Sequence, residues 1–314
     1  MYCHSPARRK LSAFIPAFII ALIISHLSLT AFAQRHQTRP RRETATQPAG
    51  STLPTLVTLG SDVVNSATRI IQDDPYAEFR DARYSNAGLL SERDETRLGQ
   101  QLHVEVGKRY RLTNDGLERA NRIGQRVARK SLRPTLVYHF YVIEDNQINA
   151  FSGPGGYVYV TTALMKLAND DELASVLSHE VGHVVARHSL KSLQQRQAVG
   201  GLADLVGSIT GVAGDAAQEL GKTAAQMVGS GLLAVHSREE EREADFLGVR
   251  GMFKAGFNAE GMITMFQKLQ SISQSDASLL GTLFRDHPDV QERIDNTRYE
   301  ITRLRRAPSR ANGR

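Results

Sequence analysis

Cysteine is almost absent from this chain of 314 residues, which contains one Cys, at position 3. Cys3 would be lost if the N-terminal segment is cleaved, and the remaining chain would then contain no cysteine. We therefore expect no disulfide and no metal site built from cysteine sulfur. An oxidising compartment is compatible with this composition but is not required by it.

A long apolar run is found only near the N-terminus. Basic residues precede the run Leu11 to Ile24, and an A-x-A cleavage signal ends at Ala33. This order is typical of a secretory signal peptide, so we expect residues 1–33 to be removed. The alternative is an uncleaved membrane anchor, because the run and the residues after it are long enough to span a bilayer. Cys3 precedes the run, so it is not a lipid-attachment cysteine of the usual secreted kind.

Acidic residues are too few to balance the basic ones, and the formal net charge is +6 with a pI near 9.5. The excess lies at the two ends, in residues 1–33 and in the arginine-rich stretches 34–43 and 303–314. The positive charge of these stretches together exceeds the net charge of the whole chain, so the body of the chain is net negative. We therefore expect no nucleic-acid partner. The basic ends are interpreted as flexible flanks that solubilise the chain or touch anionic lipid.

Composition divides the rest of the chain into four segments. Residues 34–52 are rich in Arg, Thr, Pro and Gln and predict a disordered basic linker. Residues 53–90 are interpreted as an N-terminal extension with a short helix near Ser61 to Ile71. Residues 91–302 carry the regular patterns of a folded domain, and residues 303–314 form a basic tail.

Periodic patterns within 91–302 predict helices around a small sheet. A capping box predicts a helix that begins at Ser91. Period-two patterns with aromatic and β-branched residues predict strands at 136–143 and 157–161, and the stretch SGPGG before the second strand predicts a turn with close backbone approach. Asn169 is expected to cap the next long helix. The expected fold class is α+β, mainly helical, with a small β-sheet beside that helix.

That helix contains the five residues HEVGH, His179 to His183. Two histidines four residues apart differ by about 40° around a helix, so both imidazoles can hold one metal ion. Glu180 points near the same face and can reach a water on that ion. This arrangement is typical of zinc peptidases, with the carboxylate as general base. The alternative is a helix with two surface histidines, but buried His and Glu in an apolar helix need partners, which a metal supplies.

HExxH provides two ligands, whereas a catalytic zinc normally takes three and a water. An astacin-like continuation is excluded, because Ala186 and Ser189 stand where that class needs Gly and His. His188 is five residues after His183, about 140° around the helix, so we expect it at the surface. The remaining source is a carboxylate on a later helix, within Ser237 to Asp245.

Four motifs in order make the chain similar to the HtpX and CAAX-prenyl-protease family of zinc metallopeptidases. They are the upstream NAFSGPGGYVYV, HEVGH, an E-x-x-A-D element some 58 residues later, and a downstream HP…RI element that ends at Arg293-Ile294. The resemblance covers about residues 91–300. It implies a zincin-type (gluzincin) metallopeptidase domain.

The resemblance also implies roles for single residues. It assigns Glu241 as the third zinc ligand and places His287 near the zinc, as a catalytic residue or as an occupant of the open position. We expect Asp245 to accept the second N–H of a ligand histidine and to fix its tautomer. The other acidic residues of this helix are expected to be solvated charges: Glu239, Glu240 and Glu243.

The chain departs from parts of the family. It lacks the several membrane spans of HtpX and the CAAX proteases, and in organisation it resembles the secreted envelope members of the BepA and LoiP kind. Residues Ala198 to Leu233 are rich in Gly and Ala and predict two helices, which either pack in the ordinary way or form a mobile cover over the site. The strand Tyr157 to Val160 is expected to pair with an extended substrate.

These features predict a zinc-dependent endopeptidase of the cell envelope that binds one Zn²⁺ through His179, His183 and Glu241. Glu180 would take a proton from the attacking water. The expected substrates are misfolded or misassembled envelope proteins, the expected location is the periplasm, and peripheral membrane contact is an option. One alternative is a zinc-stabilised periplasmic chaperone or assembly factor with little proteolysis. Another is a binding protein with a vestigial motif, against which the intact Glu180 argues.

Overall fold

A computed structural model describes residues 74–82, 84, 90–197, 216–231, 233, 236–280 and 290–307 of the chain. The predicted signal peptide, the basic linker, the short helix near Ser61 to Ile71 and His287 lie outside these described residues. Among the described residues, no helix combines the length and the apolar character needed to cross a membrane.

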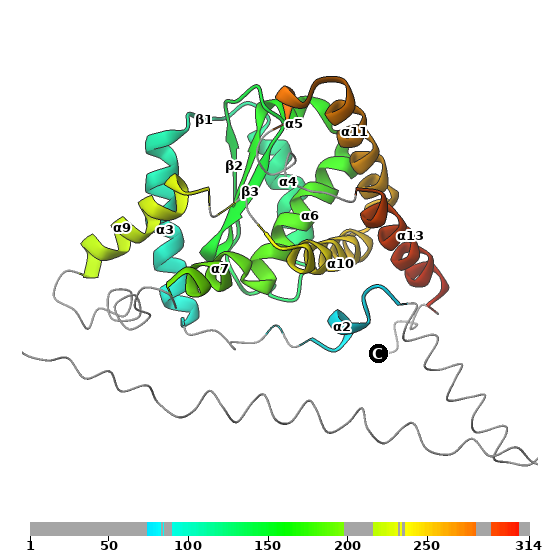
Figure 1. Ribbon diagram of the computed structural model, residues 1–314, viewed down its shortest axis with the longest axis horizontal. Coiled ribbons are helices and arrows are strands. Elements are labelled where there is room, and N and C mark those ends of the chain that lie inside the picture. The colour runs from blue at the N-terminus through cyan, green and yellow to red at the C-terminus, as the bar shows by residue number, and fades with distance from the viewer. Residues whose placement is uncertain are drawn as a thin grey trace, which may run out of the picture. The chain divides into compact units, whose positions relative to one another are not determined.

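A four-stranded mixed sheet lies at the centre of the domain (Figure 1). The strand order is β1-β2-β4-β3, with β2 and β4 parallel and the outer pairs antiparallel. The bounds are β1 Leu112–Thr113, β2 His139–Ile143, β3 Ala150–Gly153 and β4 Tyr157–Thr161. The prediction of β4 is confirmed, the strand predicted at 136–143 begins at His139, and β3 was not predicted as a strand.

The position of β4 corrects the expected mode of substrate pairing. β4 hydrogen-bonds β2 on one side and β3 on the other, so neither of its edges can accept an additional strand. The sequence pattern shows that a segment is a strand but does not show its place in the sheet. The edge strand on this side is β3.

Side chains of the sheet alternate between two apolar cores, as period-two patterns require. Phe140 and Val158 belong to one core, and Tyr157 and Tyr159 to the other. The helices α4 (Leu117–Ala128) and α6 (Asp170–Ala186) lie on the first face, while α3 (Glu92–Arg109) and α9 (Ala216–Gly229) lie on the second (Figure 1). The expected fold class, mainly helical α+β with a small sheet beside the HEVGH helix, is confirmed.

Helix α6 carries HEVGH and is almost wholly buried. It begins with the predicted capping box, in which the Asn169 side chain accepts from the Glu172 backbone and the Glu172 side chain accepts from the Asn169 backbone. It ends at Arg187, whose left-handed conformation (φ 57°, ψ 36°) turns the chain into α7 (His188–Gln197). The predicted helix start at Ser91 is also observed, because the Ser91 hydroxyl accepts from the Asp94 amide.

Helix α10 (Arg238–Ala255) packs directly against α6. Small residues allow this close approach: a Cβ added to Gly182 would lie 2.9 Å from the Ala244 carbonyl oxygen. The Gly-rich turn predicted before β4 is likewise tight, since Gly155 (φ 72°) lies against the backbone at Glu95 in α3. The contact between α6 and α10 places the acidic face of α10 over the HEVGH histidines.

The remaining described elements are short helices and two longer C-terminal helices. They are α2 (Ala77–Arg80), the 3-10 helix η1 (Pro154–Gly156), α5 (Thr162–Leu167), α11 (Glu260–Asp276), the 3-10 helix η2 (Ala277–Leu279) and α13 (Val290–Arg306). Aromatic packing joins Tyr76 and Phe79 of the N-terminal extension to Phe246 of α10. Helices α11 and α13 pack against each other and border the HEVGH face of α6.

Candidate metal centre

The structure brings together the three residues predicted to hold the metal. The Nε2 atoms of His179 and His183 are 3.0 Å apart. Glu241 places one carboxylate oxygen 3.3 Å from His179 Nε2 and the other 3.4 Å from His183 Nε2. All three side chains are buried, with exposures of 8%, 1% and 4%.

These separations are close to those around a tetrahedral zinc, although the two histidine nitrogens are nearer to each other and each faces a different Glu241 oxygen. Ligand atoms bound at about 2.0–2.1 Å in tetrahedral geometry lie about 3.3–3.4 Å from one another. Two imidazole nitrogens and one carboxylate oxygen are also a ligand set used by catalytic zinc sites, which leave the fourth position open. Among the described residues, His179, His183 and Glu241 therefore form a group that could hold a metal ion.

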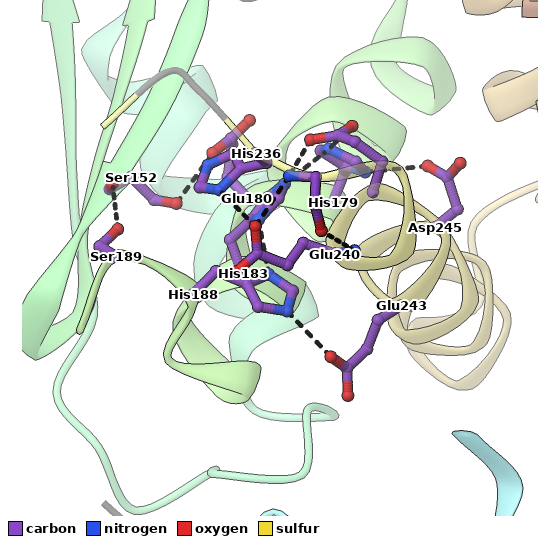
Figure 2. A network of polar contacts seen from close by, with 12 residues as sticks. Ser152, His179, Glu180, His183, His188, Ser189, His236, Glu240, Glu243 and Asp245 are labelled. Carbon is purple, nitrogen blue, oxygen red and sulfur yellow. Dashed lines mark hydrogen bonds and ion pairs between the residues drawn. The ribbon is translucent and has the colours of Figure 1, made fainter. Parts of the chain in front are cut away.

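Asp245 and Arg293 support the His179 side of this group. Asp245 Oδ1 lies 2.9 Å from His179 Nδ1, the nitrogen that faces away from the metal position (Figure 2). Arg293 of α13 donates to both oxygens of Asp245, at 2.7 and 2.8 Å, and lies 3.2 Å from Glu241. Arg293 is part of the HP…RI motif, but its contact with the site was not predicted, because the motif does not show which carboxylate the side chain meets.

The two histidines differ in their affinity for a proton. Burial by itself lowers the pKa of His179, but the adjacent carboxylates Glu241 and Asp245 raise it to about 10. Burial and the neighbouring His236 hold the pKa of His183 well below its ordinary value. Burial opposes ionisation of Glu241, yet the charges of His179 and Arg293 keep its pKa well below the usual range. His179 is therefore the more basic of the two histidines.

Glu180 lies beside the metal group with one oxygen free for a reactant. Its exposure is 1%, and Ser152 of β3 donates to its Oε2 at 2.8 Å. Among the described residues, Oε1 has no hydrogen-bond partner. Burial raises the pKa of Glu180 to about 7, which suits a group that must take up and release a proton near neutral pH. Ser152 lies within the NAFSGPGG stretch, but its contact with Glu180 was not predicted.

The prediction that His188 lies at the surface is wrong. His188 is fully buried, and its Nδ1 is 2.8 Å from Nδ1 of His183 (Figure 2). The prediction continued α6 as a straight helix, whereas the left-handed Arg187 ends it and folds His188 back toward His183. The ring of His236 stacks on His183 with centroids 3.9 Å apart.

The acidic neighbours on α10 have three different environments. Glu243 was expected to be a solvated charge, but its Oε2 lies 2.9 Å from His188 Nε2 and its side chain is largely buried. That expectation is wrong because the end of α6 brings His188 against this face of α10. Glu240 completes the capping box of α10 with Ser237, and Glu239 is exposed.

The space beside the metal group is small. A cavity of about 20 Å³ borders His179, Glu180 and Glu241, and its far wall is formed by Met262, Met265 and other apolar side chains of α11. This volume admits about one water-sized species, since roughly 10–15 Å³ is needed for one water. A larger cavity of about 230 Å³ lies on the other side of α6 and is not lined by the HEVGH side chains that face the metal position.

The Gly- and Ala-rich segment is described only in part. Its helix α9 packs on α3, where Leu220, Ala224 and Met227 join the second core. This described part therefore packs as an ordinary helix against α3. The residues from 198 to 215 lie outside the described ones.

Comparison with known proteins agrees with this geometry. The model of peptidase family M48 matches residues 117–301. The beta-barrel assembly-enhancing protease of Yersinia pestis is 30% identical over 60% of this chain and 40% of its own length. Metalloprotease YcaL of Escherichia coli is 29% identical over 68% of this chain and 83% of its own length. Metalloprotease LoiP of the same organism is 29% identical over 52% of this chain and 62% of its own length.

Proposed function

This chain belongs to peptidase family M48 and is a metalloprotease, and we propose that it is a zinc-dependent endopeptidase of the cell envelope. One observation carries the proposal. The donor atoms of His179, His183 and Glu241 converge within 3.0–3.4 Å of one another beside the buried Glu180, with one carboxylate oxygen near each histidine. The similarity to a beta-barrel assembly-enhancing protease and to metalloprotease LoiP agrees with the resemblance in the sequence.

The residues of the site would have different roles in peptide hydrolysis. Zinc held by the three ligands would lower the pKa of its bound water towards about 7 and polarise the scissile carbonyl. Glu180 Oε1 would take a proton from the attacking water and pass it to the leaving amine. Ser152 holds the other oxygen of Glu180 and so orients the carboxylate toward the reaction.

The edge strand β3 is our candidate for binding the substrate backbone. Ser152 belongs to this strand and also contacts Glu180, so a peptide paired with β3 would lie beside the general base. The Ser189 hydroxyl donates to the Ser152 carbonyl at 3.3 Å and would have to release it. Recognition of backbone rather than of one side chain suits many unfolded substrates.

We propose misfolded or misassembled envelope proteins as substrates and the periplasm as the location. The support is that the relatives include proteins named beta-barrel assembly-enhancing protease, of whose length this chain spans less than half. The same name supports a second candidate, a zinc-stabilised assembly factor with little proteolysis. No nucleic acid is proposed as a partner.

One experiment tests the enzyme directly. Zinc per chain and cleavage of an unfolded model protein would be measured with and without a chelator, for the wild type and Glu180→Gln. We expect about one zinc in both proteins, and a loss of cleavage of at least roughly 100-fold in the variant, because the general base is removed. Exposed Glu239→Gln, which removes the same charge from the surface of α10, serves as the control and should cleave normally.

The assembly candidate makes a different prediction for the same proteins. If binding is the main activity, Glu180→Gln retains the ability to suppress aggregation of the unfolded protein. Stoichiometric zinc with no cleavage by the wild type would reject the endopeptidase and favour the assembly factor.

A further inference from the structure

His188 forms a buried link between the metal group and a carboxylate outside it. On one side its Nδ1 lies 2.8 Å from His183 Nδ1, and on the other its Nε2 lies 2.9 Å from Glu243 Oε2 (Figure 2). The side chain of His188 has no exposed surface. The link therefore runs from the metal position through two imidazoles to α10.

The order of the protons in this link follows from the chemistry of its ends. Neutral imidazole has one N–H donor and one acceptor nitrogen, and a carboxylate can only accept. His188 must therefore donate from Nε2 to Glu243, which leaves its Nδ1 as an acceptor. His183 must then donate from Nδ1, and its Nε2 presents a lone pair to the metal position. The link selects the tautomer of His183 that a metal requires.

The backbone that delivers His188 is strained. Arg187 is the one residue other than glycine with positive φ among the described residues, and this conformation costs energy. Its side chain is fixed by Glu95, 3.0 Å away, and Glu95 is itself held by Arg133. Strained backbone conformations persist where surrounding contacts hold them, and they often occur at functional sites. The turn at Arg187 places His188 against His183.

A second metal site is the alternative reading of these histidines. His183, His188 and His236 each have a nitrogen within 4.8 Å of the others. The hydrogen-bonded geometry favours the link, because His188 Nε2 is engaged by Glu243. The ring of His236 stacks on that of His183 with 24° between the ring planes.

We propose that His188 and Glu243 are positioning residues, which hold His183 in the tautomer and orientation that bind the metal. This inference rests on the proposed zinc site and adds to it a support for the second histidine. Asp245 supports His179 by direct contact, whereas Glu243 supports His183 through an imidazole.

Two substitutions at position 188 separate positioning from packing. His188→Leu fills the space but cannot accept the proton of His183, whereas the amide oxygen of His188→Asn can replace Nδ1 as the acceptor. We expect zinc affinity to fall about 10–100-fold in His188→Leu and to recover at least in part in His188→Asn. Glu243→Leu should also weaken zinc binding, and Glu239→Gln on the same helix should not. Zinc affinity would be measured by competition with a chelator, and the tautomer of His183 from the ¹⁵N shifts of its imidazole in the zinc-loaded chain.

Each outcome separates this proposal from the function on which it rests. Zinc bound by the wild type with the predicted loss and recovery supports both. Equal affinity in the wild type and His188→Leu, or equal weakness in His188→Asn and His188→Leu, overturns the positioning role alone. Two zinc ions per wild-type chain, with one lost in His188→Leu, would assign the histidines to a second metal site and overturn it as well. Absence of zinc from the wild type overturns the proposed function and this inference together.

Discussion

His179 and His183 lie one turn apart on α6, yet their outer nitrogens meet different supports. Asp245 contacts His179 directly, is 1% exposed and is fixed by two hydrogen bonds from Arg293. His183 meets the ring of His188 instead of a carboxylate. The carboxylate of this second support, Glu243, lies beyond His188 and near Lys191, which is half exposed. The first support is ionic and rigid, while the second is a chain of weaker bonds that reaches toward the surface.

The comparison shows how one helix can carry two histidine ligands that differ in their affinity for a proton. The carboxylates Glu241 and Asp245 raise the pKa of His179, whereas burial and the neighbouring His236 hold the pKa of His183 well below its ordinary value. A metal that enters the site must therefore displace a proton from one histidine but not from the other.

Removing the ionic support should have the largest effect. Asp245→Ala leaves Arg293 buried without its main counter-charge, which typically costs about 3–5 kcal/mol in the free energy of unfolding. Zinc affinity should also fall about 10–100-fold. Urea denaturation of the metal-free protein and chelator competition measure the two effects. Asp295→Ala, which breaks an exposed pair with Arg298, is the control and should cost less than about 1 kcal/mol. If Asp245→Ala destabilises the protein no more than the control does, the claim that Asp245 provides a strong ionic support is wrong.

The proton affinities of the two histidines provide the next test. In the metal-free chain we expect His179 to remain an imidazolium up to about pH 10 and the pKa of His183 to lie well below its ordinary value. Asp245→Asn should lower the pKa of His179, because the removed charge favours the imidazolium. Zinc affinity should rise with pH, since binding releases the proton of His179. Imidazole ¹⁵N shifts recorded against pH measure the pKa values, and two histidines that both titrate near pH 6.5 would contradict the comparison.

The smallest effect is expected from combining the two changes. Asp245→Asn and Glu243→Gln act on different histidines and share no side-chain contact, so their costs in zinc-binding free energy should add to within about 0.5 kcal/mol. Chelator competition on the single and double variants gives the coupling. A coupling of about 2 kcal/mol would show that the supports form one network.

Most of the fold could be predicted from local signals. Capping residues at Ser91 and Asn169 and the alternation at 157–161 act over a few residues, and the structure has a helix or strand at each. The strand β3 was missed because it has four residues and is buried on both faces, so it shows no alternation. The place of β4 inside the sheet depends on contacts between distant segments and has no local signal.

The candidate site was predictable where spacing on one helix decides geometry. His179, Glu180 and His183 share a helix, and Glu241 and Asp245 share another, so each group could be found from periodicity and motif. His188 was misplaced because one left-handed residue, Arg187, ended the helix. Ser152 and Arg293 reach the site from β3 and α13, and their contacts depend on the packing of whole elements.

Anomalous diffraction at the zinc edge from crystals of the zinc-loaded chain tests the central claim most directly. The account predicts one metal peak, about 2.0–2.1 Å from Nε2 of both His179 and His183 and about 2.0–2.2 Å from an oxygen of Glu241. Both Nδ1 atoms should then remain bonded to Asp245 and His188. A peak between the Nδ1 atoms of His183 and His188, or no peak beside Glu241, would contradict it.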